Sequence, residues 1–285
     1  MTRWNWLLIL LFCAAWTLVP ASGVQLPQAV AFTGSLLSMA GAALLLGWVG
    51  LILQHEFSPA VAGGTVAAIA SIPLAASYFL WASNAGRHAE RLPFITPAIV
   101  LLGLGSAGLI VLYRFRGGQQ VIPFREGSWV ELLALLVTSL DAFWMVLKRS
   151  VSLWDTLALL GIFSVYIVFA SRLEPAPPLR EGPLSDWRHT PAPFRQIYLG
   201  LLGSAAGLLL LLSWKDMSRI AAFSDQGPKA HWVNALIDES PLLLTVLLSA
   251  LQDRPRLTLR ILIAGLVVQT SLWVGLIPVG PVLAR

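Results

Sequence analysis

Charged residues are scarce in this chain of 285 residues. Asp, Glu, Lys and Arg together make up 12% of it, whereas soluble domains carry about 25%. Hydrophobic residues make up 57%, and the mean hydropathy is +0.76. This composition excludes an ordinary soluble domain, so we expect a multi-pass integral protein of the cell membrane.

Cysteine is almost absent as well, because Cys13 is the single one. A disulfide framework and a cysteine metal cluster are therefore excluded. No Gly-rich phosphate loop, His-Glu-x-x-His pair or Ser/His/Asp set can be argued from spacing. We expect neither a cofactor nor an enzyme, and an intramembrane enzyme is the weakest alternative. The net charge of +5 lies mostly in short loops, which indicates topology signals and contacts with anionic lipid rather than nucleic-acid binding.

Long apolar stretches predict an all-α fold of about nine transmembrane helices, each of about 20 residues. The predicted spans are residues 4–21, 34–54, 59–82, 94–113, 129–147, 152–171, 196–214, 232–251 and 257–277. A Pro-rich loop over residues 172–195 separates a first membrane half (25–171) from a shorter second half (196–285), and we expect this loop on the cytoplasmic side. Residues 1–24 are either a removable signal peptide or a retained first helix with its N-terminus inside, and we favour the retained helix.

One acidic pair, Asp238-Glu239, lies inside the apolar stretch 232–251. A carboxylate at membrane depth costs ~2.5–3.5 kcal/mol on insertion scales, so it is kept mainly where it faces a cavity, an ion or a partner. Two interpretations stay open. The pair is a proton- or cation-binding centre, or the helix begins late and the pair lies in an outer vestibule at the helix N-terminus. Asp141, two turns before Lys148, is a weaker candidate for handling ions.

Two stretches share a pattern, the first from Ser58 to Ser77 and the second from Ile237 to Ala250. Each is a hydrophobic helix with small or polar residues just before an internal Pro-Leu, at Pro73 and at Pro241. Internal prolines in corresponding helices of two oppositely oriented units indicate discontinuous helices and a binding site near the midplane. We therefore predict an inverted repeat with helix breaks at Pro73 and Pro241.

These residues resemble the sodium/calcium exchanger superfamily of cation antiporters over roughly residues 34–277. The family has a Ser-Pro-x-Val-x-Gly-x-Thr segment followed by a Gly-Thr-Ser-Leu-Pro-Glu type motif. Residues 58–65 are similar to the first, and residues 70–74 and 238–242 lie in the frame of the second. The two cation-binding glutamates of the family fall at Leu74 and Leu242. The chain therefore resembles a degenerate and shortened exchanger that lacks both signature glutamates.

The resemblance implies a secondary transporter of a small cation, in which two repeats rock around a midplane site. The candidate ion-binding residues all carry side-chain oxygen: Asp238, Glu239, Ser240, Ser71, Thr65 and Gln269. A calcium site needs about 6–8 oxygen ligands, usually with several carboxylates. This set favours a proton or a monovalent ion over calcium. Because Leu74 and Leu242 replace the glutamates, the alternative is a transport-inactive pseudo-exchanger that serves as a scaffold or assembly subunit for a membrane protein partner.

Overall fold

The structure of the protein is a computed structural model, and it describes residues 3–21, 26–84, 95–115, 128–148, 152–174, 191–222, 228–251 and 255–276. Within these ranges the chain is helical and has no strand. Most of the predicted Pro-rich loop lies outside the described residues.

The first half of the chain, up to residue 171, contains a bent helix and a helix with a π-helical turn. Its elements are α1 (Arg3–Ala21), α2 (Gln28–Glu56), α3 (Pro59–Ala70), α4 (Ile72–Asn84), α5 (Ile95–Val100), η1 (Leu101–Gly105), α6 (Ser106–Phe115), α7 (Ser128–Lys148) and α8 (Leu153–Ser171). The second half repeats the long helices and the π-helical turn. Its elements are α9 (Ala192–Ala222), α10 (Pro228–Leu251), α11 (Pro255–Val267), η3 (Val268–Trp273) and α12 (Val274–Leu276).

Helices lie at each of the predicted spans, so the all-α membrane architecture is confirmed. Among the described residues, five helices are long and apolar enough to cross a membrane. The bent pair α3–α4 raises this to six, and the apolar segment Ala98–Ile110 is shorter. The number of nine spans stays a prediction.

Small polar residues define several helix starts. At the start of α3, the Ser58 side chain accepts a hydrogen bond from the Val61 amide, and Pro59 occupies the first turn, where its missing N–H costs nothing. At the start of α8, Ser152 and Asp155 form a capping box, in which each side chain accepts from the backbone amide of the other. Both caps fix where a helix enters the membrane.

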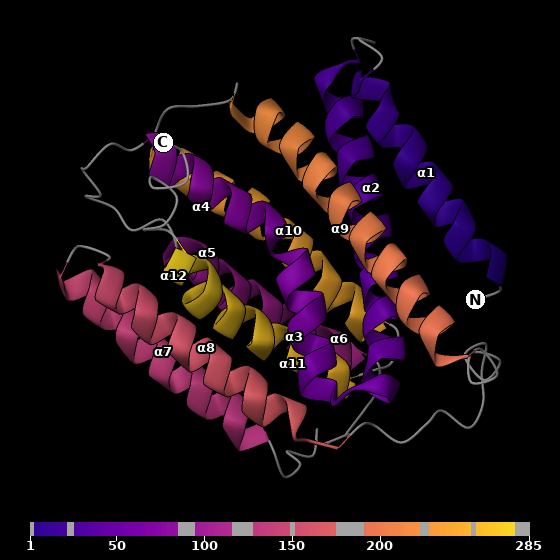
Figure 1. Ribbon diagram of the computed structural model, residues 1–285. Coiled ribbons are helices and arrows are strands. Elements are labelled where there is room, and N and C mark those ends of the chain that lie inside the picture. The colour runs from indigo at the N-terminus through magenta and orange to yellow at the C-terminus, as the bar shows by residue number, and fades with distance from the viewer. Residues whose placement is uncertain are drawn as a thin grey trace.

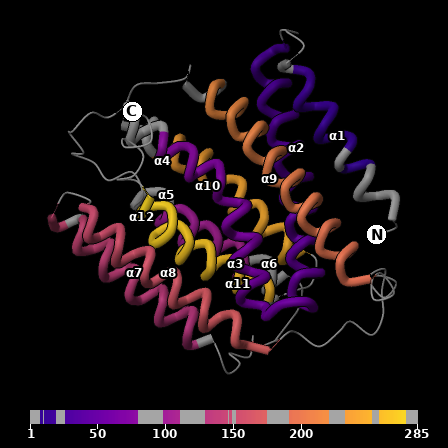
Figure 2. The backbone as a smooth tube through the Cα atoms, viewed as in Figure 1, coloured from indigo at the N-terminus to yellow at the C-terminus, as the bar shows by residue number. Residues whose placement is uncertain are grey.

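The helices form three groups (Figures 1 and 2). α1, α2 and α9 make one side of the molecule and the α7–α8 hairpin makes the opposite side, with α3, α4, α10 and α11 between them. α2 packs along α9, and α3 packs along α11. The two helices of each pair come from different halves of the chain, as an inverted repeat requires.

Close approach of helices depends on a few glycines. A Cβ added at Gly63 would lie 3.2 Å from the Arg260 carbonyl carbon, and one at Gly207 would lie 2.9 Å from the Ile69 side chain. Small residues let helices in lipid approach closely enough for van der Waals contact. Nothing lies within 4 Å of a Cβ added at Gly103 or Gly200, so close packing requires glycine at some of these positions only.

Candidate functional site

The acidic pair lies halfway along α10. Asp238 and Glu239 are the eleventh and twelfth of its 24 residues, and the helix already begins at Pro228. The vestibule interpretation, in which the helix begins late, is therefore wrong. Glu239 is fully buried, at 0% exposure, and Asp238 is partly buried. The pair thus belongs to the interior of the helix bundle.

Glu239 is held by an amide from the next helix. Gln269 Nε2 donates to Glu239 Oε2 at 2.8 Å, and both side chains are buried. Gln269 lies in η3, a π-helical turn, and such turns are frequent at functional sites. Among the described residues, Glu239 Oε1 and Gln269 Oε1 have no hydrogen-bond partner. Each of these oxygens is a buried acceptor that remains available to a proton or a cation.

Asp238 is held by two donors from two other helices. Trp214 Nε1, on α9, donates to Asp238 Oδ1 at 2.9 Å. The Ser77 hydroxyl, on α4, donates to Asp238 Oδ2 at 2.9 Å. Both carboxylate oxygens therefore have a partner, and Asp238 joins α4, α9 and α10 at one point. Neighbouring residues of α10 thus differ sharply, because Glu239 keeps a free oxygen and Asp238 does not.

The first repeat contributes a bent helix to the same region. α3 and α4 meet at an angle of 48°, with Ser71 between them and Pro73 as the second residue of α4. The Ser71 hydroxyl donates to the Ala67 carbonyl at 2.7 Å and accepts from Trp273 Nε1 at 2.8 Å. Its proton is used by its own helix and one of its two lone pairs by an indole N–H, so one lone pair of Ser71 is left for another partner.

The second repeat lacks the predicted break at Pro241, because α10 is one helix from Pro228 to Leu251. A proline removes the hydrogen bond to the carbonyl four residues earlier, which here is that of Ile237. The Ser240 hydroxyl donates to this carbonyl at 2.7 Å, so the freed acceptor is satisfied inside the helix. Ser240 is one of the ion-binding candidates predicted from the sequence. In the structure its hydroxyl instead supports the helix.

Thr65 does not join the site. Its side chain is exposed, and its hydroxyl donates to the Val61 carbonyl of its own helix at 2.9 Å. It lines an apolar groove of about 760 Å³ between α2, α3 and α9. Of the six predicted ligands, the structure brings Asp238, Glu239 and Gln269 together, with Ser71 nearby at the helix bend.

The two positions of the family glutamates are filled by tightly packed leucines. Leu74 is 0% exposed and Leu242 is 1% exposed. A Cβ added at Gly265 would lie 2.7 Å from Leu242 Cδ2, so α11 presses against this side chain. Apolar packing thus encloses both positions, and the carboxylates of the second repeat are those of the two residues before Ser240.

Sequence reasoning missed the aromatic side chains that surround the pair. The indole N–H of Trp214 donates to Asp238, and that of Trp273 donates to Ser71 at the helix bend. Tyr78 is 2% exposed, and its hydroxyl has no hydrogen-bond partner among the described residues. It lies within electrostatic reach of both Glu239 and Asp238. The seven-residue spacing from Ser71 to Tyr78, two helical turns, was the available signal.

The arrangement fits a proton better than a metal ion. Two side chains contact the carboxylates through N–H donors, Gln269 on Glu239 and Trp214 on Asp238, and an N–H group cannot coordinate a cation. Within the described ranges, no group of three or more His, Cys, Asp or Glu side chains could hold a metal. Calcium as a transported ion would need about 6–8 oxygen ligands, and the residues present do not supply them.

An ion pair joins helices α11 and α7. Arg260, on α11, contacts Glu131, on α7, at 3.4 Å, with side-chain exposures of 14% and 1%. Tyr166, on α8, lies within electrostatic reach of both, and its hydroxyl has no hydrogen-bond partner in the described part of the chain. This pair fastens the α7–α8 hairpin to the second repeat.

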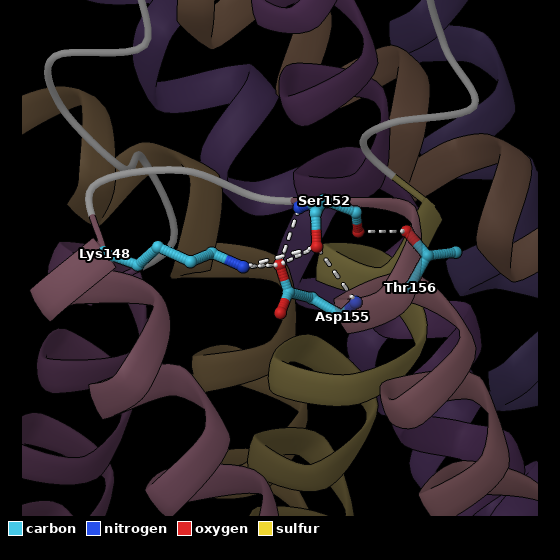
Figure 3. A network of polar contacts seen from close by, with 4 residues as sticks. All are labelled: Lys148, Ser152, Asp155 and Thr156. Atoms are coloured by element: carbon cyan, nitrogen blue, oxygen red, sulfur yellow. Dashed lines mark hydrogen bonds and ion pairs between the residues drawn. The ribbon is translucent and has the colours of Figure 1, made fainter.

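A third polar cluster lies at the turn between α7 and α8 (Figure 3). Lys148 forms an ion pair with Asp155 Oδ2, which also accepts from the amide and the hydroxyl of Ser152. Lys148 is 31% exposed and Asp155 is 9% exposed. The cluster therefore has one partly exposed member, Lys148, and one nearly buried member, Asp155, at the end of the hairpin.

Comparison with known proteins places this geometry in a fold. No protein-family model matches the chain, and no curated protein matches it either. Solved structures do match. The H+/Ca2+ exchanger CAX superposes with a TM-score of 0.74 at 22% sequence identity, over 99% of this chain and 74% of that chain.

The sodium-calcium exchanger NCX_Mj, soaked with 10 mM Na+ and zero Ca2+, superposes with a TM-score of 0.63 at 16% identity, over 93% of this chain and 82% of that chain. The same exchanger soaked with 2.5 mM Na+ and 0.1 mM Ca2+ gives 0.61 at 18%, over 86% and 79%. The predicted resemblance to sodium/calcium exchangers is thus confirmed at the level of the fold.

Proposed function

We propose that the protein is a secondary transporter of a small cation, and that Asp238 and Glu239 carry the coupling charge. The observation that supports this most is the fully buried Glu239, halfway along α10, with one free oxygen. Ionisable residues at this depth commonly mark ion pathways and proton relays. Of a proton and a monovalent ion, the surrounding N–H donors favour the proton.

The site joins the two repeats in the way that alternating access needs. Asp238 bridges α4 of the first repeat to α9 and α10 of the second. Transporters with inverted repeats bind their ions between the repeats and move one repeat against the other around that site. In this mechanism protonation neutralises Glu239, and a neutral centre is cheaper to enclose in apolar surroundings than a charged one.

The folds of the neighbours support the class of function. Their names describe an H+/Ca2+ exchanger and a sodium-calcium exchanger. The exchange of a proton for a second small cation agrees both with the fold and with the N–H donors that contact Asp238 and Glu239. Calcium as the second ion is disfavoured, because Leu74 and Leu242 occupy the positions of the family glutamates.

Flux in proteoliposomes tests the proposal. The purified chain is reconstituted with a pH-sensitive dye inside, and gradients of Na+, K+, Ca2+ and Mg2+ are imposed in turn. We expect one gradient to drive proton movement, and we expect Asp238→Asn with Glu239→Gln to abolish it. Asp216→Asn is the matched control, because Asp216 is a partly buried carboxylate on α9 whose charged neighbours are Arg219 and Lys215. Undiminished flux in the double variant would show that the mechanism is wrong.

Leu74 and Leu242 also favour a second candidate function. A pseudo-exchanger would keep the fold as a scaffold or assembly subunit for another membrane protein. It predicts no stabilisation by any ion, whereas a ligand at a hundredfold excess over its Kd stabilises the folded state by about 2.7 kcal/mol. Thermal unfolding in a series of ions and pH values, together with a stable partner on purification, distinguishes the two functions.

A further inference from the structure

Three buried polar atoms on three different helices lack hydrogen-bond partners among the described residues. They are Glu239 Oε1 on α10, the Tyr78 hydroxyl on α4 and Asp141 Oδ2 on α7. Glu239 is 0% exposed and Tyr78 is 2% exposed. Buried polar groups in native proteins nearly always have a partner, which is often an ordered water molecule. Other buried polar atoms of the described residues, such as Gln269 Oε1 and the Tyr166 hydroxyl, also lack one, and the three named first are distinguished by the packing that connects their helices.

The inner two atoms belong to residues that follow a hydrogen-bonded pair: the Ser77 hydroxyl donates to Asp238 Oδ2 at 2.9 Å, and Tyr78 and Glu239 are the next residues along α4 and α10. Tyr78 lies within electrostatic reach of Glu239 and of Asp238. Asp238 already accepts from Trp214 and Ser77, so its two oxygens are occupied. Glu239 Oε1 is thus the one carboxylate oxygen of the acidic pair that has no partner among the described residues.

Asp141 is connected to Tyr78 by the side chains with which α7 packs against α4. Tyr78 packs in one buried cluster with Met145, Leu159 and Val274, and Ala142 packs against that cluster. Met145 is four residues from Asp141, so both lie on the same face of α7. The face of α7 that carries Asp141 is therefore turned toward Tyr78.

Asp141 in turn lies on the same face of α7 as Lys148, seven residues and two helical turns before it, and Lys148 belongs to the cluster at the α7–α8 turn. Asp141 lies within electrostatic reach of Asp155 and Lys148. These two side chains form the ion pair that Figure 3 shows, and Lys148 is 31% exposed. The polar groups thus continue from solvent at the turn to the centre of the bundle.

We propose that these residues form a proton pathway from the α7–α8 turn through Asp141 and Tyr78 to Glu239. The proposal rests on the proposed function, because it gives the central carboxylate its route to one side of the membrane. Asp141 takes a proton from water at the turn and becomes a carboxylic acid. It passes a proton, directly or through bridging water, to the Tyr78 oxygen, and Tyr78 releases its own hydroxyl proton to Glu239 Oε1. Asp141 is again a carboxylate, Tyr78 is again a phenol, and Glu239 is neutral.

A tyrosine suits this position because a phenol accepts and donates at the same oxygen. The charged groups that face the pathway are Asp155 and Lys148 at Asp141, and Asp238 and Glu239 at Tyr78. Tyr78→Phe removes the hydroxyl and keeps the ring, so it interrupts the pathway without opening a cavity.

The experiment follows the protonation of Glu239 itself, so it does not depend on transport. The detergent-purified chain receives a rapid pH jump, and time-resolved infrared spectroscopy records the carboxylic-acid carbonyl band that Glu239→Gln removes. Tyr78→Phe and Asp141→Asn are compared with two matched controls. Tyr166→Phe alters another buried phenol that lacks a partner in the described structure, beside Glu131 and Arg260, and Asp216→Asn alters a carboxylate on α9.

We expect Tyr78→Phe and Asp141→Asn each to slow the rise of the Glu239 band by about a hundredfold, the lower range for positioned proton-transfer groups. Tyr166→Phe and Asp216→Asn should match the wild type. Wild-type rates in Tyr78→Phe and Asp141→Asn, or a Glu239 band that never responds to pH, would overturn the pathway. Slowed bands in a protein that shows no ion-driven flux would instead keep the pathway and reject the transporter.

Discussion

The hydrogen bond from Gln269 to Glu239 permits a quantitative test of how the centre is held together. The two side chains are 1% and 0% exposed, and Nε2 lies 2.8 Å from Oε2. Gln269→Leu approximately keeps the volume and removes the donor, so the carboxylate stays buried without this partner. An unpaired buried polar group costs about 1–3 kcal/mol. We expect Gln269→Leu to lower the free energy of unfolding by about 2 kcal/mol, because the abandoned acceptor is a carboxyl group.

Replacing both partners should cost much less than the two single changes together. Paired buried polar groups can often be exchanged for apolar ones of similar volume at little cost. We expect the Glu239→Leu/Gln269→Leu variant to recover most of the loss. The coupling energy should be about 1–2 kcal/mol, near the upper end of values between polar side chains in membrane proteins.

Reversible unfolding in mixed detergent micelles, followed by circular dichroism, measures these free energies. The matched control pairs Glu239→Leu with Gln54→Leu, a buried glutamine on α2 with 8% exposure, and this pair should be additive. Additivity of Glu239→Leu and Gln269→Leu within about 0.5 kcal/mol would refute the bond. The double variant should also lose proton-coupled flux, since a stable apolar centre has no site for a proton.

Three further predictions concern the packing of the helices. Gly63→Ala should lower the unfolding free energy by about 1–3 kcal/mol, because its Cβ would meet the Arg260 backbone at 3.2 Å, whereas Gly103→Ala, with nothing within 4 Å, should leave it unchanged or raise it. Glu131→Leu should cost about 3 kcal/mol by stranding Arg260, and Glu131→Leu with Arg260→Leu should recover much of that in the same unfolding assay. Ser152→Ala removes the cap of α8 and should cost about 1 kcal/mol, with earlier hydrogen exchange in the first turn of that helix.

The architecture followed from the sequence because its signals are local. Apolar stretches of about 20 residues predict spanning helices whatever surrounds them, and helices lie at every predicted stretch. The bend between α3 and α4 could be anticipated from Pro73. Pro241 carried the same signal and misled, because the Ser240 hydroxyl compensates the carbonyl that the proline frees. Ser240 precedes Pro241 whereas Ile72 precedes Pro73, so a hydroxyl in this position is available in the continuous helix and not in the bent one.

The site was predictable only where charge made it conspicuous. Asp238 and Glu239 were identified because carboxylates are rare in apolar stretches, and Gln269 because its frame matched a known family. Their donors came from contacts that span long sequence separations, such as Trp214 to Asp238 and Trp273 to Ser71. The direction in which an indole points is set by tertiary packing, which no local pattern encodes. Thr65 was misplaced for the same reason, since its helix turns it toward the groove.

The asymmetry of the centre restricts what the two repeats can do. Leu74 and the Trp273–Ser71 bond leave the first repeat's helix bend without charge, whereas α10 places both carboxylates in the second repeat. Asp238 accepts two hydrogen bonds, whereas Glu239 keeps one oxygen without a partner among the described residues, so we expect Glu239 to be the group whose charge changes. A single proton then converts the pair from two charges to one. Enclosing a charge in an apolar bundle is costly, so in the proposed transporter this one proton biases which arrangement of the two repeats is stable. A calcium ion would find no carboxylate in the first repeat to replace its bound water.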